Sequence, residues 1–194
     1  MHRNARFLLT IVVLLVSGGL CAQEAYRSPD PDLLARLSFD GPATAQGEGS
    51  RHVCVAVSRD GDYRIVRSLN SGHTQRLHGK MPQQQFQQLK TLLGSTDFRV
   101  LSGNHGGLIR QESETFGAEV IIPGRRGEDR TQQLRWLNAD GESPFPAAVT
   151  KVVNWLRRFE PTDGKEFEYA EYPDVCPSGG LRFLQPSVAT NLHP

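Results

Sequence analysis

Apolar and polar residues alternate in two groups of short segments, and each group is followed by a stretch with helical periodicity. In the first group, residues 52–57 and 63–67 flank the turn residues Asp60-Gly61-Asp62, which is the pattern of a β-hairpin. A third short strand is predicted at 74–77. A helix is predicted over 82–93, where Pro82 suits a first helical position and apolar residues recur at helical spacing: Phe86, Leu89 and Leu93.

The second group repeats this order. Strands are predicted at 98–101, 116–122 and 130–137, and a second helix begins near Ser143-Pro144 and ends near Arg158. Three strands, a helix, three strands and a helix predict an α+β fold. Its simplest form is an antiparallel sheet of about five to six strands with two helices packed on one face.

Segments rich in proline and glycine flank this predicted domain, which we place at 51–159. We interpret residues 23–50 as a flexible linker, in which the apolar piece Leu33–Leu37 can dock as a single helical turn. Residues 160–194 are predicted to form an extended tail.

The first 22 residues have the pattern of a signal peptide. Arg3 and Arg6 precede the uncharged run Phe7–Val16, and Leu20-Cys21-Ala22 suits a cleavage site, so we place the cut after Ala22. The alternative is an uncleaved membrane anchor, but the apolar run is shorter than the roughly 20 residues that a bilayer requires. We therefore expect a periplasmic or secreted protein with no membrane span after cleavage.

The charge balance limits the classes of partner. The chain has 22 Lys and Arg residues and 21 Asp and Glu residues, and removing 1–22 removes Arg3 and Arg6, which leaves 20 basic against 21 acidic residues. No surplus of positive charge remains to neutralise phosphate groups. Neither nucleic acid nor an anionic membrane surface is therefore an expected partner.

Cleavage leaves two cysteines, Cys54 and Cys176. In an oxidising compartment two cysteines most often pair, so we predict a Cys54–Cys176 disulfide that tethers the tail to the domain. The alternative is two unpaired cysteines, one buried in a strand and one in the tail.

The most unusual stretch is the loop between the predicted strands of the second group. Its candidate binding residues are Asn104, His105, Gly106, Gly107 and Arg110. Glycine permits positive φ angles and close approach of another backbone, so this segment is interpreted as a recognition loop. In that role, His105 and Arg110 are available to an acidic or carbonyl group. The alternative is a well-ordered turn whose histidine only caps backbone carbonyls.

The other candidate groups match no catalytic or metal-binding pattern. The histidines have no zinc-protease spacing, and no Gly-x-Ser-x-Gly motif is present. Glu112, Glu114 and Glu119 lie close together in sequence, but a solvated strand face is the simpler interpretation. Trp136 and Trp155 fall inside periodic elements and are expected in the core. No metal or other cofactor is expected.

One further pattern concerns the order of residues after the hairpin. Its members are Gly79, Met81-Pro82, Phe86–Leu89, Leu92-Leu93, Asp97–Leu101, Phe116–Ile122, Leu134–Trp136, Val149, Val152, Val153, Trp155 and Leu156. This layout, over 51–159, resembles the emfourin-like domains, small bacterial inhibitors of thermolysin-type metallopeptidases. The resemblance implies a secreted peptidase as partner. The predicted linker, the cysteine-bearing tail and the Gly-Asn-His-Gly-Gly loop depart from it, and it carries over no inhibitory residue.

These observations favour an exported, non-catalytic binding module, with peptidase inhibition as its candidate activity. A protein outside the cytoplasm is the expected partner, met by the loops at one end of the sheet. Two alternatives stay open. One is a small secreted hydrolase-type enzyme that uses His105 with Glu112 or Glu114 as general acid and base. The other is a cell-envelope accessory protein with a structural role.

Overall fold

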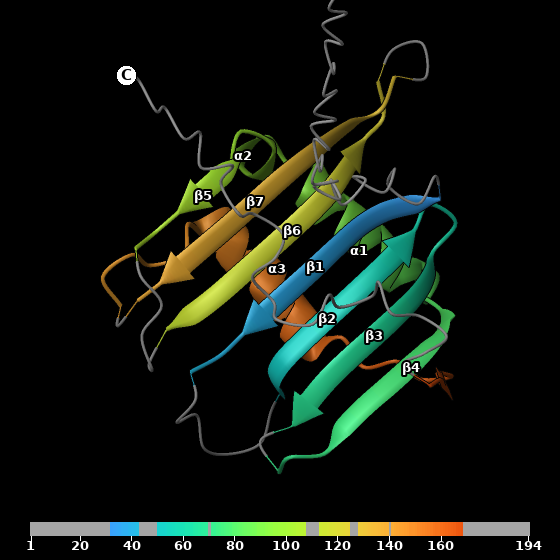
Figure 1. Cartoon of the computed structure of the whole chain (residues 1–194). Coiled ribbons are helices and arrows are strands. Elements are labelled where there is room, and N and C mark those ends of the chain that lie inside the picture. The colour runs from blue at the N-terminus through green and yellow to red at the C-terminus, as the bar shows by residue number, and fades with distance from the viewer. Residues whose placement is uncertain are drawn as a thin grey trace, which may run out of the picture.

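The computed structural model describes residues 32–42, 50–69, 71–107, 113–124, 128–139 and 141–168. Within these ranges the chain forms eight strands and three helices (Figure 1). In chain order these are β1 (Leu33–Asp40), β2 (Ser50–Ser58), β3 (Asp62–Leu69), β4 (Thr74–Lys80), α1 (Gln83–Gly94), α2 (Thr96–Arg99), β5 (Gly103–His105), β6 (Glu114–Ile122), β7 (Arg130–Asn138), α3 (Ala147–Arg158) and β8 (Lys165–Glu166).

All eight strands belong to one sheet, in the order β5-β7-β6-β1-β2-β3-β4-β8. Neighbouring strands pair antiparallel, except that β5 runs parallel to β7. α1 and α3 pack against each other and lie behind the sheet in Figure 1, on the same face. The α+β prediction is therefore confirmed, with a mostly antiparallel sheet and two main helices.

The predicted linker at 23–50 is wrong over Leu33–Asp40. This segment is β1, which lies in the middle of the sheet between β2 and β6. Ala35, Leu37 and Phe39 are buried in the core, and Arg36 points to the opposite face, where it pairs with a glutamate. Buried and less buried residues alternate along this segment with the two-residue period of a strand. The prolines and glycines around it hide that pattern when residues 23–50 are judged by their overall composition.

The predicted strand at 98–101 is also wrong, because residues 96–99 form the short helix α2. Ser95 caps this helix: its side-chain oxygen accepts a hydrogen bond from the backbone amide of Phe98. The chain then enters the sheet later than predicted, at β5. Four residues are too few for periodicity to separate a strand from a helical turn.

The sheet also extends beyond the predicted domain end at 159. Residues Lys165–Glu166 form β8, which pairs with Leu77 and His78 of β4. Phe167 follows and is only 6% exposed. The sheet has eight strands rather than five to six because β1, β5 and β8 are added and 98–101 is helical.

The main core lies between the sheet and the two long helices. It takes Phe86, Leu89 and Leu93 from α1, together with five residues of α3: Val149, Val152, Val153, Trp155 and Leu156. These pack on alternate residues of β1, β2, β3 and β6. Trp155 lies in this core and Trp136 packs against it, as expected.

The other face of the sheet has a smaller apolar cluster, formed by Leu33, Cys54, Ala56, Val66, Ile121 and Phe167. Beside it, Arg36 Nη1 donates to Glu119 Oε2 at 2.9 Å. The two side chains are only 19% and 10% exposed, and β1 and β6 place them directly opposite each other. This ion pair lies among the central strands of the sheet.

Several predictions fall on parts of the chain outside the described residues. These are the signal peptide at 1–22, most of the tail and Cys176. The Cys54–Cys176 disulfide therefore stays a prediction, and Cys54 itself is buried in β2. In the ranges described, every helix is too short or too polar to cross a bilayer.

Candidate functional site

The predicted recognition loop contains an edge strand of the sheet. Gly103, Asn104 and His105 form β5, in register with Leu134, Arg135 and Trp136 of β7. β5 is the last strand in the sheet order, so no strand of the described chain lies on its outer side. We call residues 100–107 the edge segment.

Two glycines fix the path of the edge segment. Gly103 and Gly106 have φ angles of 84° and 100°, which residues with side chains rarely adopt. A Cβ on Gly106 would lie 2.2 Å from the carbonyl oxygen of Leu137, so the backbones of the edge segment and β7 come into close contact here. Gly107 has open space around it and an ordinary φ.

His105 is held by two contacts. Its ring stacks on Trp136 with centroids 4.3 Å apart and planes 17° apart. Its Nε2 donates to the carbonyl oxygen of Ser102 at 2.8 Å. Trp136 is in turn fixed, because its Nε1 donates to the carbonyl oxygen of Ser143 at 3.0 Å. The His105 side chain therefore packs against β7 and stabilises the edge segment.

The exposed part of the edge segment is made by other residues. Asn104, Gly106 and Gly107 are exposed. Val100 is 71% exposed and is the one exposed large hydrophobic residue found in the described ranges. The structure thus brings together four of the five predicted binding residues, whereas Arg110 lies outside the described part of the chain.

The carboxylates considered as partners of His105 make other contacts. Glu114 Oε2 accepts a hydrogen bond from Asn138 Nδ2 at 3.2 Å, and Glu119 pairs with Arg36 on the opposite face of the sheet. Glu112 is not among the described residues. The contacts of His105 are with a backbone carbonyl and an indole ring, neither of which is an acid or a base.

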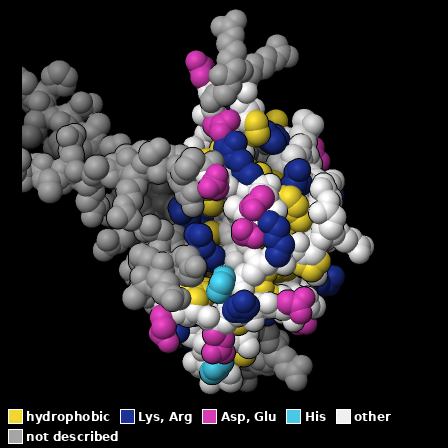
Figure 2. All heavy atoms as spheres, turned by 90° about the vertical axis from the view of Figure 1, so that its right-hand side faces the viewer, with side chains coloured by type: hydrophobic (Ala, Val, Ile, Leu, Met, Phe, Trp, Pro, Cys, Tyr) yellow, Lys and Arg dark blue, Asp and Glu magenta, His cyan; other side chains and the backbone are white. Residues whose placement is uncertain are grey.

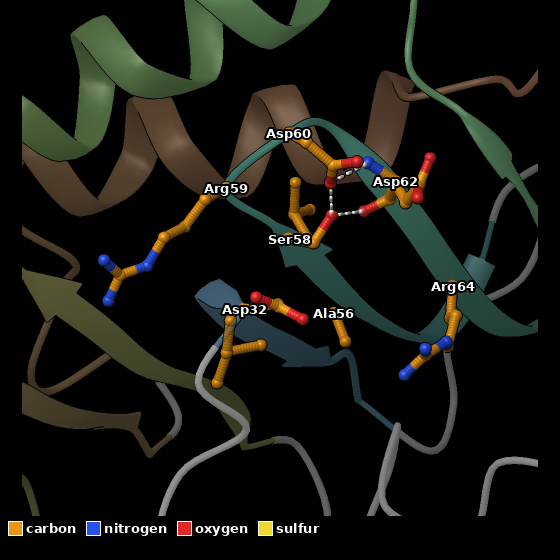
Figure 3. A pocket seen from close by; sticks show the side chains of 9 residues that line it. Asp32, Ala56, Ser58, Arg59, Asp60, Asp62 and Arg64 are labelled. Atoms are coloured by element: carbon orange, nitrogen blue, oxygen red, sulfur yellow. Dashed lines mark hydrogen bonds between the residues drawn. The ribbon is translucent and has the colours of Figure 1, made fainter.

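A cavity of about 380 Å³, which the sequence pattern does not predict, lies at the β2–β3 hairpin (Figure 3). Its lining residues are Asp32, Leu33, Ala56, Val57, Ser58, Arg59, Asp60, Asp62 and Arg64. In Figure 3, Asp60 and Ser58 point toward each other across the turn, and Arg59 points away from them. Arg59 pairs with Asp129, the residue before β7.

Two aspartates of this cavity, Asp60 and Asp62, are held by contacts at the turn. Ser58 donates its hydroxyl proton to Asp60, and Lys80 Nζ lies 2.9 Å from Asp60 Oδ2 and 3.1 Å from Asp62 Oδ1. The Ser58 hydrogen bond first, and then Lys80, hold the pKa of Asp60 well below its usual range. The two aspartates raise the pKa of Lys80 in return. These contacts stabilise the hairpin. Because Asp60 and Asp62 already have partners within the protein, the edge segment is the better candidate for binding.

A metal centre has no basis in the described ranges, where no three histidine, cysteine, aspartate or glutamate residues are grouped to hold an ion.

No family model matches this chain, and no curated protein matches it either. The resemblance to emfourin-like domains over 51–159 therefore stays a prediction.

Proposed function

We propose that this chain is a non-catalytic binding domain that works outside the cytoplasm and contacts a protein partner through the edge segment. The observation that carries the proposal is that an exposed segment is held rigidly at the sheet edge. Asn104 is exposed, while the next residue, His105, is fixed on Trp136. A segment that is already ordered loses little conformational entropy when it binds.

The outer side of β5 supports the same proposal. Because β5 is the edge strand, its outward backbone N–H and C=O groups face away from β7. An extended segment of a partner can add to such an edge through backbone hydrogen bonds. The exposed glycines at 106 and 107 allow another chain to approach closely.

For the partner we propose a secreted peptidase of the thermolysin type. This choice follows from the resemblance to emfourin-like domains. In this proposal, Asn104, Gly106 and Gly107 make contact, His105 positions them, and Arg110 adds a cationic group. No cofactor is involved.

Export belongs to the same proposal. The predicted signal peptide at 1–22 sends the chain to the periplasm or the medium, where Cys54 and Cys176 pair and tether the tail. Cys54 suits this role because it is 2% exposed in the apolar cluster on the face of the sheet away from the helices.

The test is an inhibition assay with the mature protein and a panel of secreted peptidases that includes thermolysin-type enzymes. We expect saturable inhibition of at least one of them. Asn104→Arg should weaken it at least tenfold, because it places a long charged side chain at the contact. His73→Arg is the matched control, since His73 is also exposed but lies beyond β3, near the opposite edge of the sheet. Full activity of every peptidase at large excess of the protein would refute the inhibitory role.

A further inference from the structure

A second concave surface lies between the two long helices. It has a volume of about 310 Å³ and is lined by Gln85, Gln88, Leu92, Lys151, Asn154, Trp155, Arg158 and Phe159. We call it the α1–α3 groove. It opens to solvent, because four of its five polar lining residues are exposed: Gln88, Lys151, Asn154 and Arg158.

The floor of the groove is aromatic and rigid. Trp155 stacks on Phe159 with centroids 5.2 Å apart and planes 12° apart. Phe159 in turn meets the ring of Tyr63 edge-on, at 5.2 Å and 85°. Because Tyr63 belongs to β3, this chain of rings anchors the groove to the sheet.

The two helices that form the groove carry only basic charges. α1 contains Lys90 and no acidic residue, and α3 contains Lys151, Arg157, Arg158 and no acidic residue. By contrast, acidic and basic side chains are interspersed on the face of the molecule that Figure 2 shows. In a chain with nearly equal numbers of both charges, the two helices therefore concentrate positive charge.

Two of these four cations are available at the groove. Lys90 lies over the ring of Phe86, 5.3 Å from its centroid, and Arg157 lies over Phe39, at 5.5 Å. Lys151 and Arg158 line the groove, and neither makes an ion pair with any residue that the structure describes.

A hydrogen-bond acceptor in the groove also lacks a partner. Gln85 Oε1 is buried and accepts no hydrogen bond from any described residue. A buried acceptor without a donor is costly, so a rotation of the Gln85 amide that brings Oε1 to a ligand N–H in the groove is favoured. Gln88 and Asn154 add exposed amide groups beside it.

We propose that the α1–α3 groove binds an acidic segment of a partner protein. An apolar side chain of that segment packs on Trp155, its carboxylates lie near Lys151 and Arg158, and one of its N–H groups donates to Gln85. The groove volume suits one or two side chains. An anionic membrane is a poorer fit, because the exposed surfaces of α1 and α3 present no large apolar side chain for insertion within the described residues.

The probe is a capped peptide with one phenylalanine between two pairs of glutamates, titrated into the mature protein at low salt. Trp155 reports binding through its fluorescence in a Trp136→Phe background, and calorimetry on the unmodified protein gives a second measurement. We expect saturable binding, at least tenfold weaker for Lys151→Glu and for Arg158→Glu. A peptide with glutamine in place of glutamate should bind at least tenfold more weakly.

Lys90→Glu is the matched control, because it changes the net charge equally on the same pair of helices but lies outside the groove. It should change the affinity less than threefold. Equal weakening by Lys90→Glu and Lys151→Glu would overturn the proposal, since it would show a general effect of net charge. Binding to phosphatidylserine vesicles with no binding of the peptide would also overturn it. Asn104→Arg should leave peptide binding unchanged, which separates this site from the edge segment.

Discussion

A methyl group on Gly106 would lie 2.2 Å from the carbonyl oxygen of Leu137. The φ angle of Gly106 is 100°, which is unfavourable for any residue with a side chain. We therefore expect Gly106→Ala to lower the free energy of unfolding by about 3 kcal/mol or more, from backbone strain and the forced separation of the edge segment from β7. Urea unfolding followed by circular dichroism measures this.

Gly107→Ala provides the control, because a Cβ there meets no atom within 4 Å and the φ angle is ordinary. Its effect should stay within about 0.5 kcal/mol. Equal destabilisation by the two substitutions would show that Gly106 does not fix the edge segment.

Asp60 gives a prediction for acid pH. Its pKa is lower in the folded protein than its ordinary value of 3.8, mainly because Ser58 and Lys80 stabilise the carboxylate. The stability that Asp60 contributes is therefore present above the unfolded pKa and is lost as the pH falls through the folded pKa. Asp60→Asn should flatten the loss of stability below about pH 4.

The measurement is the free energy of unfolding of both proteins between pH 7 and pH 2. Glu128→Gln, at an exposed carboxylate, is the control and should keep the acid dependence of the natural sequence. If Asp60→Asn also kept it, the ionised Asp60 carboxylate would not be the source of the acid dependence.

The candidate site was predictable at some residues and not at others. Glycine-rich composition correctly singles out 103–107 as a distinct segment, because Gly103 and Gly106 need positive φ. The role of His105 was not predictable, because its stacking partner Trp136 is 31 positions away and meets it only when β5 pairs with β7. The α1–α3 groove depends in the same way on two helices that are distant in sequence.

Among the secondary-structure elements, β1 is the most important one that the sequence analysis did not predict. Leu37 is fully buried between the neighbouring strands and the helices. Leu37→Ala should therefore cost about 2–5 kcal/mol of stability, the range for a large-to-small change in a core. A flexible linker at 23–50 would instead give a change near zero in the same thermal or urea unfolding experiment.

The sequence predicts well those helices and strands that are long enough for the spacing of their apolar residues to show a clear period. The β2–β3 hairpin and the apolar faces of α1 and α3 follow directly from their spacing. β8 could not be predicted, since two residues carry no period and its pairing depends on β4. α2 is hidden because Phe98–Leu101 is apolar enough for a strand, while Ser95 supplies a helix cap.

For the whole molecule, the predicted Cys54–Cys176 disulfide gives a direct test of export. We expect no reactive thiol in the native mature protein and two after unfolding and reduction. Reduction should lower stability by up to about 5 kcal/mol, because the bridge closes a loop of more than 100 residues. Cys176→Ser should be as stable as the reduced protein. Two reactive thiols before reduction would contradict the bridge.

The two binding surfaces that we propose lie on separate parts of the molecule. The edge segment extends the sheet at β5, and the α1–α3 groove lies in the helix layer that packs on the sheet. The charges of the chain balance as a whole, but α1 and α3 carry only basic ones.

We expect the edge segment to be the main contact with the protein partner. This can be tested by amide hydrogen exchange of the mature protein, with and without an inhibited thermolysin-type peptidase. Binding should slow exchange at residues 102–107 and change it little at the β3–β4 turn around His73. Unchanged exchange at 102–107 in a complex that does form would contradict it.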